Sequence, residues 1–347
     1  MKRERSVRIL LIGAGNLGRR LAQLITDKHD ELLKRYALDI RLVGIADSRG
    51  AAVNADGLDG HAIAELKQAG KSVSDLPNVG HPGMSGLELI DATPADILCE
   101  AGPVHLSANA EPGLSHVRHA LEKGLHVATP NKGPIVLAYR ELMALAHSHG
   151  VQLRFDGTVA GGLPAIALAA RDLRGATLQR LETVPNLTTG LILDLLAAGV
   201  TWDEAIDQAR EAGALEGDGV WDIDGWDATA KLTILALSVL DQDVDLHDVP
   251  REGIRAIDPA WLKAASSNGR VRLLASAIRQ SDGSYQYNVA PVALPPDHAL
   301  GNLTSQQMGI TIETDLFGTI TSIITEETPL PSAASMLRDL LEIYVAK

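Results

Sequence analysis

A glycine-rich turn constrains the fold of this chain more than any other stretch of its sequence. The turn follows the apolar run RILLI and precedes an amphipathic segment, NLGRRLAQLITDKHDELLKRYA. Its pattern is G-x-G-x-x-G, formed by Gly13, Ala14, Gly15, Asn16, Leu17 and Gly18. Between a strand and a helix, such glycines allow a tight turn, let a pyrophosphate approach backbone N–H groups, and let the helix pack closely on the strand. We therefore expect a dinucleotide-binding βαβ unit, against the simpler interpretation of an ordinary glycine turn.

The choice between NAD and NADP depends on the last residue of the next predicted strand and on the two residues after it. Asp47 closes that strand, DIRLVGIAD, and a carboxylate there can accept hydrogen bonds from the adenosine ribose of NAD. Ser48 and Arg49 come directly after it and can hold the 2′-phosphate of NADP. Arg49 is equally well explained as a loop cation in solvent. The sequence leaves both cofactors open.

Residues 6–130 alternate between short apolar runs and amphipathic segments. The runs SVRILLIG, DIRLVGIAD, ADILCEA and LHVAT predict parallel strands joined by helices. The expected fold class is α/β, with a Rossmann-type doubly wound parallel sheet. Residues 50–90 are rich in Gly, Asp, Asn and Pro, so we expect an excursion from that sheet there.

A second domain of α+β type is expected after about residue 150, because the pattern changes there. VQLRFDGTVAGG and TLQRLETVPN are strand-like, and a helical section runs from TGLILDLLAAG through DATAKLTILALSVL. QMGITIETDLFGTITSIIT alternates like antiparallel strands, and SAASMLRDLLEIYVAK predicts a closing helix. The expected domains are 1–150 for dinucleotide binding, 151–305 for catalysis and dimerisation, and 306–347, which packs back on the first domain.

Composition and charge exclude several classes of partner. The net charge is −13 with only Trp 4, Tyr 5 and Phe 2, whereas nucleic-acid binding needs a basic face and stacking platforms. The apolar run ILLI is shorter than the core of a signal peptide, and no apolar stretch approaches the roughly 18 residues of a membrane helix. The single cysteine, Cys99, cannot form an internal disulfide. We expect a cytoplasmic protein with a small-molecule substrate and neither nucleic acid nor membrane as partner.

Lys132 follows the predicted strand LHVAT within the sequence TPNKGP. Parallel strands deliver the groups at their carboxyl ends to a ligand crevice, so Lys132 and its neighbour Asn131 are candidates for a cofactor or catalytic site. A lysine between Asn and Gly is ordinarily a surface cation. The local sequence does not decide between the two.

The acidic stretch EGDGVWDIDGWDATAK contains a DIDG core like that of a calcium-binding EF-hand loop. Such a loop needs an oxygen ligand at its first position and a bidentate Glu at its twelfth. Those positions are Val220 and Lys231, which excludes the calcium interpretation.

A helix start explains part of the same acidic stretch. We expect Asp224 as the N-cap, with Asp227 in the first turn and Lys231 four residues later on the same face. Lys231 heads an apolar run, where a charge needs a partner. Glu216 and Asp222 remain available to face the same cleft.

Taken in order, these motifs resemble the homoserine dehydrogenase family over nearly the whole chain. The order is G-x-G-x-x-G, then N-K-G-P, then V-x-x-G-x-P from Val159, then E-x-D…D-x-x-G-x-D-x-x-x-K. The resemblance implies an oxidoreductase that uses NAD or NADP on a primary alcohol or aldehyde, such as homoserine or aspartate semialdehyde. It also implies a homodimer formed through the sheet of the second domain.

The resemblance implies roles for four side chains. Lys132 matches the catalytic lysine after the nicotinamide strand, and Lys231 matches a second lysine, oriented by Asp227. Glu216 matches the carboxylate that binds the substrate amino group. A lysine desolvated beside a second ammonium loses proton affinity and can act as the acid–base group, whereas a lysine held by a carboxylate positions oxygen.

A monovalent cation is also implied. The family binds it largely through backbone carbonyls in a segment that resembles FDGTVAGGL. The matching positions are Asp156, Val159, Gly161 and Leu163. Asp156 stands where the family usually has Glu, which shortens the reach.

Two segments depart from the family pattern. Where the family carries N-G-T-[TS]-N, this chain has Asn186, Leu187, Thr188, Thr189 and Gly190. We take Asn186, Thr188, Thr189 and Asp222 as substrate-binding candidates in an altered pocket. Where the family has a G-P-G-A-G turn beside the nicotinamide, residues 324–328 read ITEET.

These departures keep two alternatives open. One is a lyase on the same scaffold, which breaks a C–C bond and releases formaldehyde from a larger hydroxymethyl substrate, for example an aromatic one. The other is a non-catalytic dinucleotide-binding protein, although Lys132, Glu216, Asp227 and Lys231 are all present.

Overall fold

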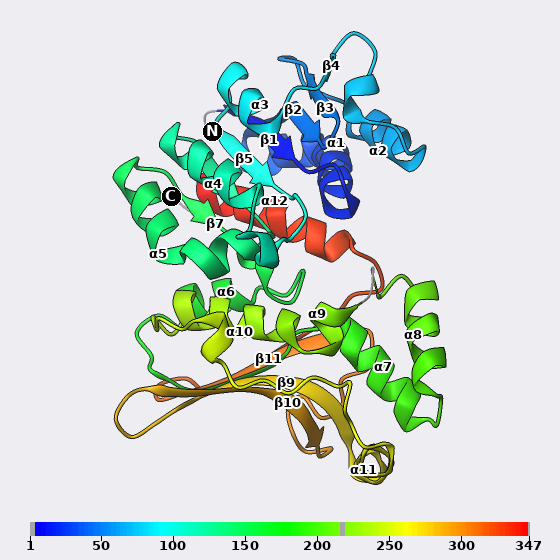
Figure 1. The fold of residues 1–347 in the computed structure, drawn as a ribbon. Coiled ribbons are helices and arrows are strands. Elements are labelled where there is room, and N and C mark those ends of the chain that lie inside the picture. Colours follow the sequence, from blue (N-terminus) through cyan, green and yellow to red (C-terminus); the bar gives the residue numbers. More distant parts are fainter. Residues whose placement is uncertain (1–3, 216–218, 346–347) are drawn as a thin grey trace. The chain divides into compact units, whose positions relative to one another are not determined.

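The computed structural model describes residues 4–215 and 219–345 and divides the chain into two compact units (Figure 1). The first unit is Met1–Gly162 with Thr328–Lys347, and the second is Leu163–Glu327. The expected boundaries at 150 and 305 therefore need correction. Residues 153–154 pair with the first sheet and residues 307–325 with the second, so only the end of the expected 306–347 segment returns to the first unit.

The first unit contains a seven-stranded sheet in the order β4-β3-β2-β1-β5-β6-β7. Its strands are β1 Arg5–Ile12, β2 Leu38–Asp47, β3 Gly50–Val53, β4 Gly80–Pro82, β5 Ile97–Glu100, β6 His126–Ala128 and β7 Leu153–Arg154. From β2 to β7 neighbouring strands run parallel. The central strands are nearly continuous apolar runs, as expected of parallel strands covered on both faces. The expected Rossmann-type α/β fold is confirmed.

Most of residues 50–90 lie outside the sheet, as expected, but the segment also contributes the two short strands β3 and β4. β3 pairs antiparallel with β2, and β4 pairs antiparallel with β3, so this segment extends the sheet at one edge. The two strands have 4 and 3 residues, too few for an alternating pattern to be recognised among the glycines and turns.

In its described residues, the first unit has five α-helices within residues 13–148 and a sixth near the end of the chain. They are α1 Asn16–Tyr36, α2 Gly60–Gln68, α3 Gly86–Ala92, α4 Gly113–Glu122, α5 Lys132–Ser148 and α12 Leu330–Val345. The last of these, red in Figure 1, packs against α1 and adds Met336, Leu340 and Ile343 to the main core cluster. Among the described residues, no helix has both the length and the hydrophobicity that crossing a membrane requires.

The second unit is built on a five-stranded sheet in the order β10-β9-β8-β11-β12, antiparallel throughout. Its strands are β8 Leu178–Val184, β9 Arg270–Arg279, β10 Tyr285–Leu294, β11 Gln307–Thr314 and β12 Gly318–Thr325. Its helices are α6 Ala165–Ala167, α7 Leu187–Ala197, α8 Trp202–Glu211, α9 Val220–Ile223, α10 Trp226–Ser238 and α11 Pro259–Ala265. α7 and α10 pack against β9. β9 and β10, which form the longest hairpin of this sheet, were not anticipated from the sequence.

Candidate active site

The glycine-rich turn has the geometry that a dinucleotide needs. Gly13 has φ +96°, and a Cβ there would lie 2.3 Å from the Ala101 carbonyl oxygen. A Cβ at Gly18 would lie 1.8 Å from the Gly13 oxygen, whereas at Gly15 nothing lies within 4 Å. Two glycines are thus required by packing, and the third keeps the approach to the helix open.

The N-terminus of α1 is suited to an anion. Gly15 is its N-cap and makes no side-chain cap, so the positive end of the helix dipole is not covered by a carboxylate. The Asn16 side chain accepts hydrogen bonds from Arg19 and Arg20, which adds two cations to the first turn, while Leu17 is half-buried. These residues fit the pyrophosphate of NAD or NADP.

Asp47, expected to bind the ribose, is occupied inside the protein. Lys67 Nζ lies 2.6 Å from Oδ2, the Val73 N–H donates to the same oxygen, and the Ser72 hydroxyl and Arg49 N–H donate to Oδ1. The Asp47 side chain is 7% exposed. Although burial opposes ionisation, these four donors lower its pKa to about 2. With four donors on its two oxygens, Asp47 holds the turn after β2 and has no position left for a ribose hydroxyl.

Ser48 and Arg49 are both exposed directly after Asp47. The Arg49 guanidinium donates to the Gly70 carbonyl at 2.9 Å, a single neutral acceptor. Its charge is therefore not cancelled by a carboxylate in this contact. Of the three residues expected to select the cofactor, the two that suit a 2′-phosphate are the two that face solvent.

Asn131 was expected to contact the cofactor, but its side-chain amide caps α5 instead. Its Oδ1 accepts from the Gly133 N–H at 3.1 Å, and its Nδ2 donates to Glu100 Oε2 at 3.0 Å. The residue is 2% exposed. Lys132 is the first residue of the helix that Asn131 caps, and it is half-buried.

Glu100 was not identified from the sequence, although it belongs to this site. It is the last residue of β5, paired in register with Ile12 immediately before the glycine-rich turn. Its side chain is fully buried and accepts hydrogen bonds from the Gly102 N–H and from Asn131. The available signal was an acid closing the apolar strand ILCE at the carboxyl edge of a parallel sheet. The carboxyl ends of β1, β5 and β6 thus bring the glycine-rich turn, Glu100 and Lys132 to one edge.

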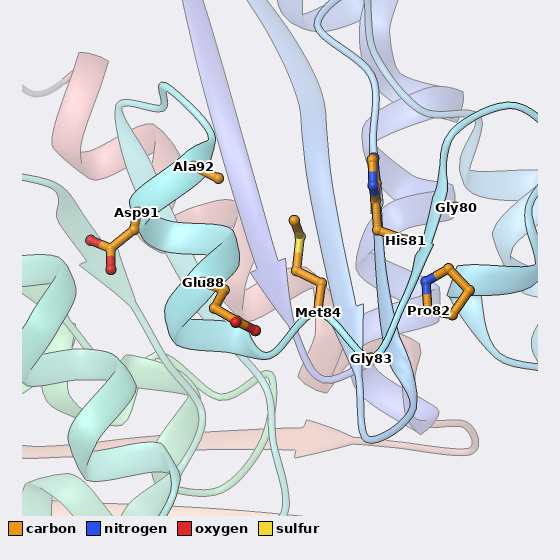
Figure 2. A pocket seen from close by; sticks show the side chains of 8 residues that line it. All are labelled: Gly80, His81, Pro82, Gly83, Met84, Glu88, Asp91 and Ala92. Atoms are coloured by element: carbon orange, nitrogen blue, oxygen red, sulfur yellow. The ribbon is translucent and has the colours of Figure 1, made fainter.

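A pocket of about 760 Å³ lies beside α3 and the short strand β4 (Figure 2). It is lined by Gly80, His81, Pro82, Gly83, Met84, Glu88, Asp91 and Ala92. Glu88 is held by Ser85 in a capping box, and Asp91 pairs with His119 and Lys123. Because two carboxylates line it, and both already have partners, we do not assign this pocket to a phosphate-bearing cofactor.

In the second unit, Lys231 and Asp227 form the pair expected from their spacing. Lys231 Nζ lies 2.7 Å from Asp227 Oδ2, and each side chain is 12% exposed. The ammonium also donates to the Pro185 carbonyl at 2.6 Å. The Asn186 amide bridges Asp227, at 2.7 Å, and Asp222, at 2.5 Å. The strand–helix turn and the start of α10 thus form one polar cluster.

Asp224 is not the N-cap of α10, contrary to expectation. The N-cap is Gly225 with φ +81° and no side-chain bond, because Asp224 is already the C-cap of the preceding short helix α9. The Asp224 carboxylate instead accepts from Arg255 Nε at 2.8 Å, and its carbonyl accepts from Arg251. Glu216, expected to bind the substrate amino group, lies outside the described residues.

Thr188 and Thr189, expected to contact substrate, are buried and use their hydroxyls internally. Thr188 donates to the Ala214 carbonyl at 2.6 Å, and Thr189 donates to Asn186. The Thr189 N–H also bonds to Asn186 Oδ1 at 2.9 Å, which makes Asn186 the N-cap of α7. Both threonines therefore shape the turn that holds Asn186, and Asn186 and Asp222 remain the polar candidates.

The turn implied to hold a monovalent cation already contains a guanidinium. Arg338 pairs with the Asp156 carboxylate and donates to the Gly162 carbonyl at 2.8 Å. The implied ligands are partly engaged as well, since the Asp156 carbonyl accepts from the Val159 N–H and the Leu163 carbonyl accepts from Ala165. A second cation beside Asp156 would be repelled by Arg338. These residues do not fit the cation.

The segment ITEET continues β12 through its first two residues and bends at Glu327 and Thr328. Ile324 and Thr325 are strand residues, and the Glu326 N–H bonds to the Gln306 carbonyl at 2.9 Å. Glu326 is buried, whereas Glu327 is exposed. Extended pairing explains the β-branched residues that stand where the family has glycines.

Comparison with known proteins identifies one family. The sequence profile of homoserine dehydrogenase matches residues 164–341, and that of the homoserine dehydrogenase NAD binding domain matches residues 13–156. The chain belongs to the homoserine dehydrogenase family. The resemblance seen in the ordered motifs is thereby confirmed.

Relatives of the family align over almost the whole chain. The NAD(+)-dependent homoserine dehydrogenase of Pseudomonas canavaninivorans is 33% identical over 342 residues, which cover 97% of this chain and 96% of that protein. The homoserine dehydrogenase of Methanocaldococcus jannaschii is 33% identical over 337 residues, covering 97% and 98%. A solved hyperthermophilic archaeal homoserine dehydrogenase in complex with NADPH has a TM-score of 0.84 at 27% identity and covers 99% of each chain. Membership of this family makes the chain an NAD(P)-dependent dehydrogenase, and these relatives give no support to the lyase alternative.

Proposed function

We propose that the chain is an NADP(H)-linked homoserine dehydrogenase, which interconverts the primary alcohol of homoserine and the aldehyde of aspartate semialdehyde. The observation that carries this proposal is the ion pair of Lys231 and Asp227, held beside Asn186. The relatives named above are homoserine dehydrogenases, which gives the substrate its support.

The ammonium of Lys231 is prepared to bind an oxygen. A lysine ammonium has three N–H donors, and two of them bond to Asp227 and to the Pro185 carbonyl. The third bonds to none of the described residues. It would hold the alcohol oxygen of homoserine, or the carbonyl oxygen of the aldehyde in the reverse direction.

Oxidation of a primary alcohol removes a proton from oxygen and a hydride from carbon. Bound NADP⁺ supplies the hydride acceptor. We assign the proton to Lys132, which begins α5 behind its buried cap, Asn131. In the reverse direction Lys132 would return the proton to the aldehyde oxygen. For the substrate amino group we propose Glu216, with Asp222 as a second carboxylate.

The preference for NADP(H) rests on residues 47–49. An NAD-selective site needs a carboxylate acceptor for the ribose, and that of Asp47 is filled by four internal donors. Ser48 and Arg49 are exposed beside it, as a 2′-phosphate would require. The relatives divide on this point, since one is named for NAD(+) and another was solved with NADPH.

We further propose a homodimer through the sheet of the second unit. Ile323 on the edge strand β12 is 47% exposed, and Phe317 in the adjoining β-turn is 50% exposed. Exposed apolar side chains on a sheet surface are suited to a partner surface of the same kind.

An assay of the purified protein tests the reaction. Reduction of NADP⁺ with L-homoserine, and oxidation of NADPH with aspartate semialdehyde, are both expected, and Lys231→Met should abolish both. Aldehyde release with no change in nicotinamide absorbance would favour the lyase. Tight NADPH binding with neither reaction would show a dinucleotide-binding protein without this activity.

A further inference from the structure

We propose that Glu100 is a positioning residue for Lys132, acting through the side chain of Asn131. The proposal rests on the function proposed for Lys132. It concerns a buried carboxylate to which the mechanism above gives no task.

The surroundings of Glu100 are those of a carboxylate held by neutral donors. Its side chain is fully buried at the end of β5. It accepts from the Gly102 N–H at 3.0 Å and from Asn131 Nδ2 at 3.0 Å. The Thr129 hydroxyl donates to the Glu100 backbone carbonyl at 2.8 Å and lies 3.4 Å from the carboxylate. The His116 ring nitrogen Nδ1 lies 3.8 Å away, and no ion pair with Lys or Arg is formed among the described residues. A carboxylate so buried is costly to keep, so its hydrogen bonds must serve a purpose that an apolar residue would not.

The role of Glu100 follows from the hydrogen bond that the other end of the Asn131 amide, Oδ1, makes. Asn131 Oδ1 accepts from the Gly133 N–H and so caps α5, the helix that begins with Lys132. An amide can be reversed by rotation of its end group, which would place its NH₂ against the Gly133 N–H and remove the cap. Because Glu100 Oε1 accepts from the Gly102 N–H and Oε2 faces Asn131 as an acceptor, Glu100 requires the Nδ2 of Asn131 to face it and thereby fixes the capping orientation.

The packing leaves the Asn131 amide little room to move. A Cβ added to Gly113 would lie 2.6 Å from Asn131 Nδ2, and one added to Gly133 would lie 3.3 Å from Asn131 Oδ1. Both ends of the amide are therefore enclosed by backbone. Displacement of a reacting group by about 1 Å can lower a rate by about 100-fold, so the orientation of this cap bears directly on turnover.

Exchanging the two polar groups tests the proposal. Glu100→Gln replaces one acceptor oxygen by an NH₂, so the side chain can no longer accept from both the Gly102 N–H and Asn131 Nδ2. It should lower kcat about 10- to 100-fold while KM for homoserine changes less than about threefold. The double variant Glu100→Gln with Asn131→Asp reverses the direction of this hydrogen bond. The amide at position 100 then donates to the carboxylate at position 131, and that carboxylate still accepts from the Gly133 N–H. The double variant should recover kcat to within about threefold of the original chain, with no change in net charge. Asn131→Asp alone places two carboxylates against each other, so its kcat should stay below that of the double variant.

Three outcomes would overturn the proposal. One is a kcat for Glu100→Gln within about twofold of the original. Another is a double variant whose thermal unfolding is normal but whose kcat stays low. If the single variant does not fold, the double variant decides alone, because restored folding and turnover support the bond and their absence contradicts it.

A readout independent of turnover separates this proposal from the function itself. Competitive acetylation followed by mass spectrometry measures the reactivity of Lys132 against the exposed Lys28 in the same sample. We expect Glu100→Gln to change that ratio at least threefold and the double variant to restore it, even if homoserine is not the substrate. An unchanged ratio in Glu100→Gln would reject the positioning role, whatever the assay with homoserine shows.

Discussion

Lys231 lies one helical turn after Asp227 on α10, and its ammonium is 2.7 Å from the Asp227 oxygen that also accepts from Asn186. One carboxylate oxygen thus joins a lysine from the helix to an asparagine from the strand–helix turn. The arrangement holds both side chains with only 12% of the lysine exposed. It explains why a charge can stand at the head of an apolar helix.

Removing the charge of Lys231 should stop the reaction without affecting the first unit. Lys231→Met should lower kcat by about 100- to 10,000-fold, the range of a positioned proton or oxygen contact. Asp227→Asn, which leaves the lysine in place but unpaired, should have a smaller effect. Steady-state kinetics measures both. NADPH binding to Lys231→Met should be unchanged, and a loss of binding would show that the variant acts by unfolding.

Asp47 should stabilise the fold at neutral pH and not in acid. Its pKa is about 2 in the folded chain and about 3.9 when unfolded, so the folded state favours the ionised form. That stability is present above about pH 4 and is lost as the pH falls towards 2. Urea unfolding at pH 7 should find Asp47→Asn less stable by about 2 kcal/mol, with the difference shrinking towards acid. The exposed Asp30→Asn serves as control and should change stability by less than about 0.5 kcal/mol. An equal loss at every pH would contradict the argument.

Cofactor choice should depend on Arg49. Arg49→Ala should raise the Kd for NADPH about tenfold or more, because a charged contact to the 2′-phosphate is lost, and should leave NADH within about twofold. Fluorescence titration of the reduced nicotinamide measures both. Arg41→Ala removes an exposed arginine on β2 that pairs with Asp39, and provides the matched control. Tighter binding of NADH than NADPH by the original chain would refute the assignment.

Turnover should not require sodium or potassium. Arg338 already supplies a cation to Asp156 and Gly162, so activity and thermal unfolding should be the same in sodium, potassium and tetramethylammonium buffers. Arg338→Gln removes the cation that pairs with the buried Asp156 carboxylate and should cost about 2 kcal/mol of stability, less than a fully buried pair because Arg338 is partly exposed. Activation by either metal ion in the original chain would show that the turn does hold a metal.

The proposed dimer should dissociate when β12 is charged. Ile323→Arg puts a cation on the exposed face of the sheet, which should convert a dimer to a monomer in light scattering after size-exclusion chromatography. Leu137→Arg changes a similarly exposed apolar residue on α5, in the other unit, and should leave the dimer intact. A monomeric original chain would end the proposal.

The parts of the fold that were predictable carry their signal within a few neighbouring residues. The glycine-rich turn reads directly as strand, turn and helix, and the spacing of Asp227 and Lys231 gives their contact through helix geometry alone. Asp224 shows the limit of such reasoning. A carboxylate before a helix suggests an N-cap, but Asp224 is the C-cap of the four-residue helix α9, and the N-cap of α10 is Gly225.

The missed features depend on residues distant in sequence. The sequence near Asp47 does not indicate that Lys67 and Ser72 will donate hydrogen bonds to it. Both residues lie 20 or more positions later in the chain, near and beyond the end of α2. Glu100 likewise could not be identified from its neighbours in sequence. Its contact with Asn131 forms only because β5 and β6 pair side by side in the sheet. β9 and β10 were missed because their buried and exposed residues do not alternate regularly.

The helix α12 has a consequence for how the chain is made. It completes the core around α1 with Met336, Leu340 and Ile343, yet the entire second unit precedes it in the sequence. When a ribosome has produced residues 1–162, the nucleotide-binding unit still lacks one wall of its core, and apolar surface on α1 stays uncovered until the polypeptide has returned. Translation thus delivers the second unit as a complete folding unit before the first can close.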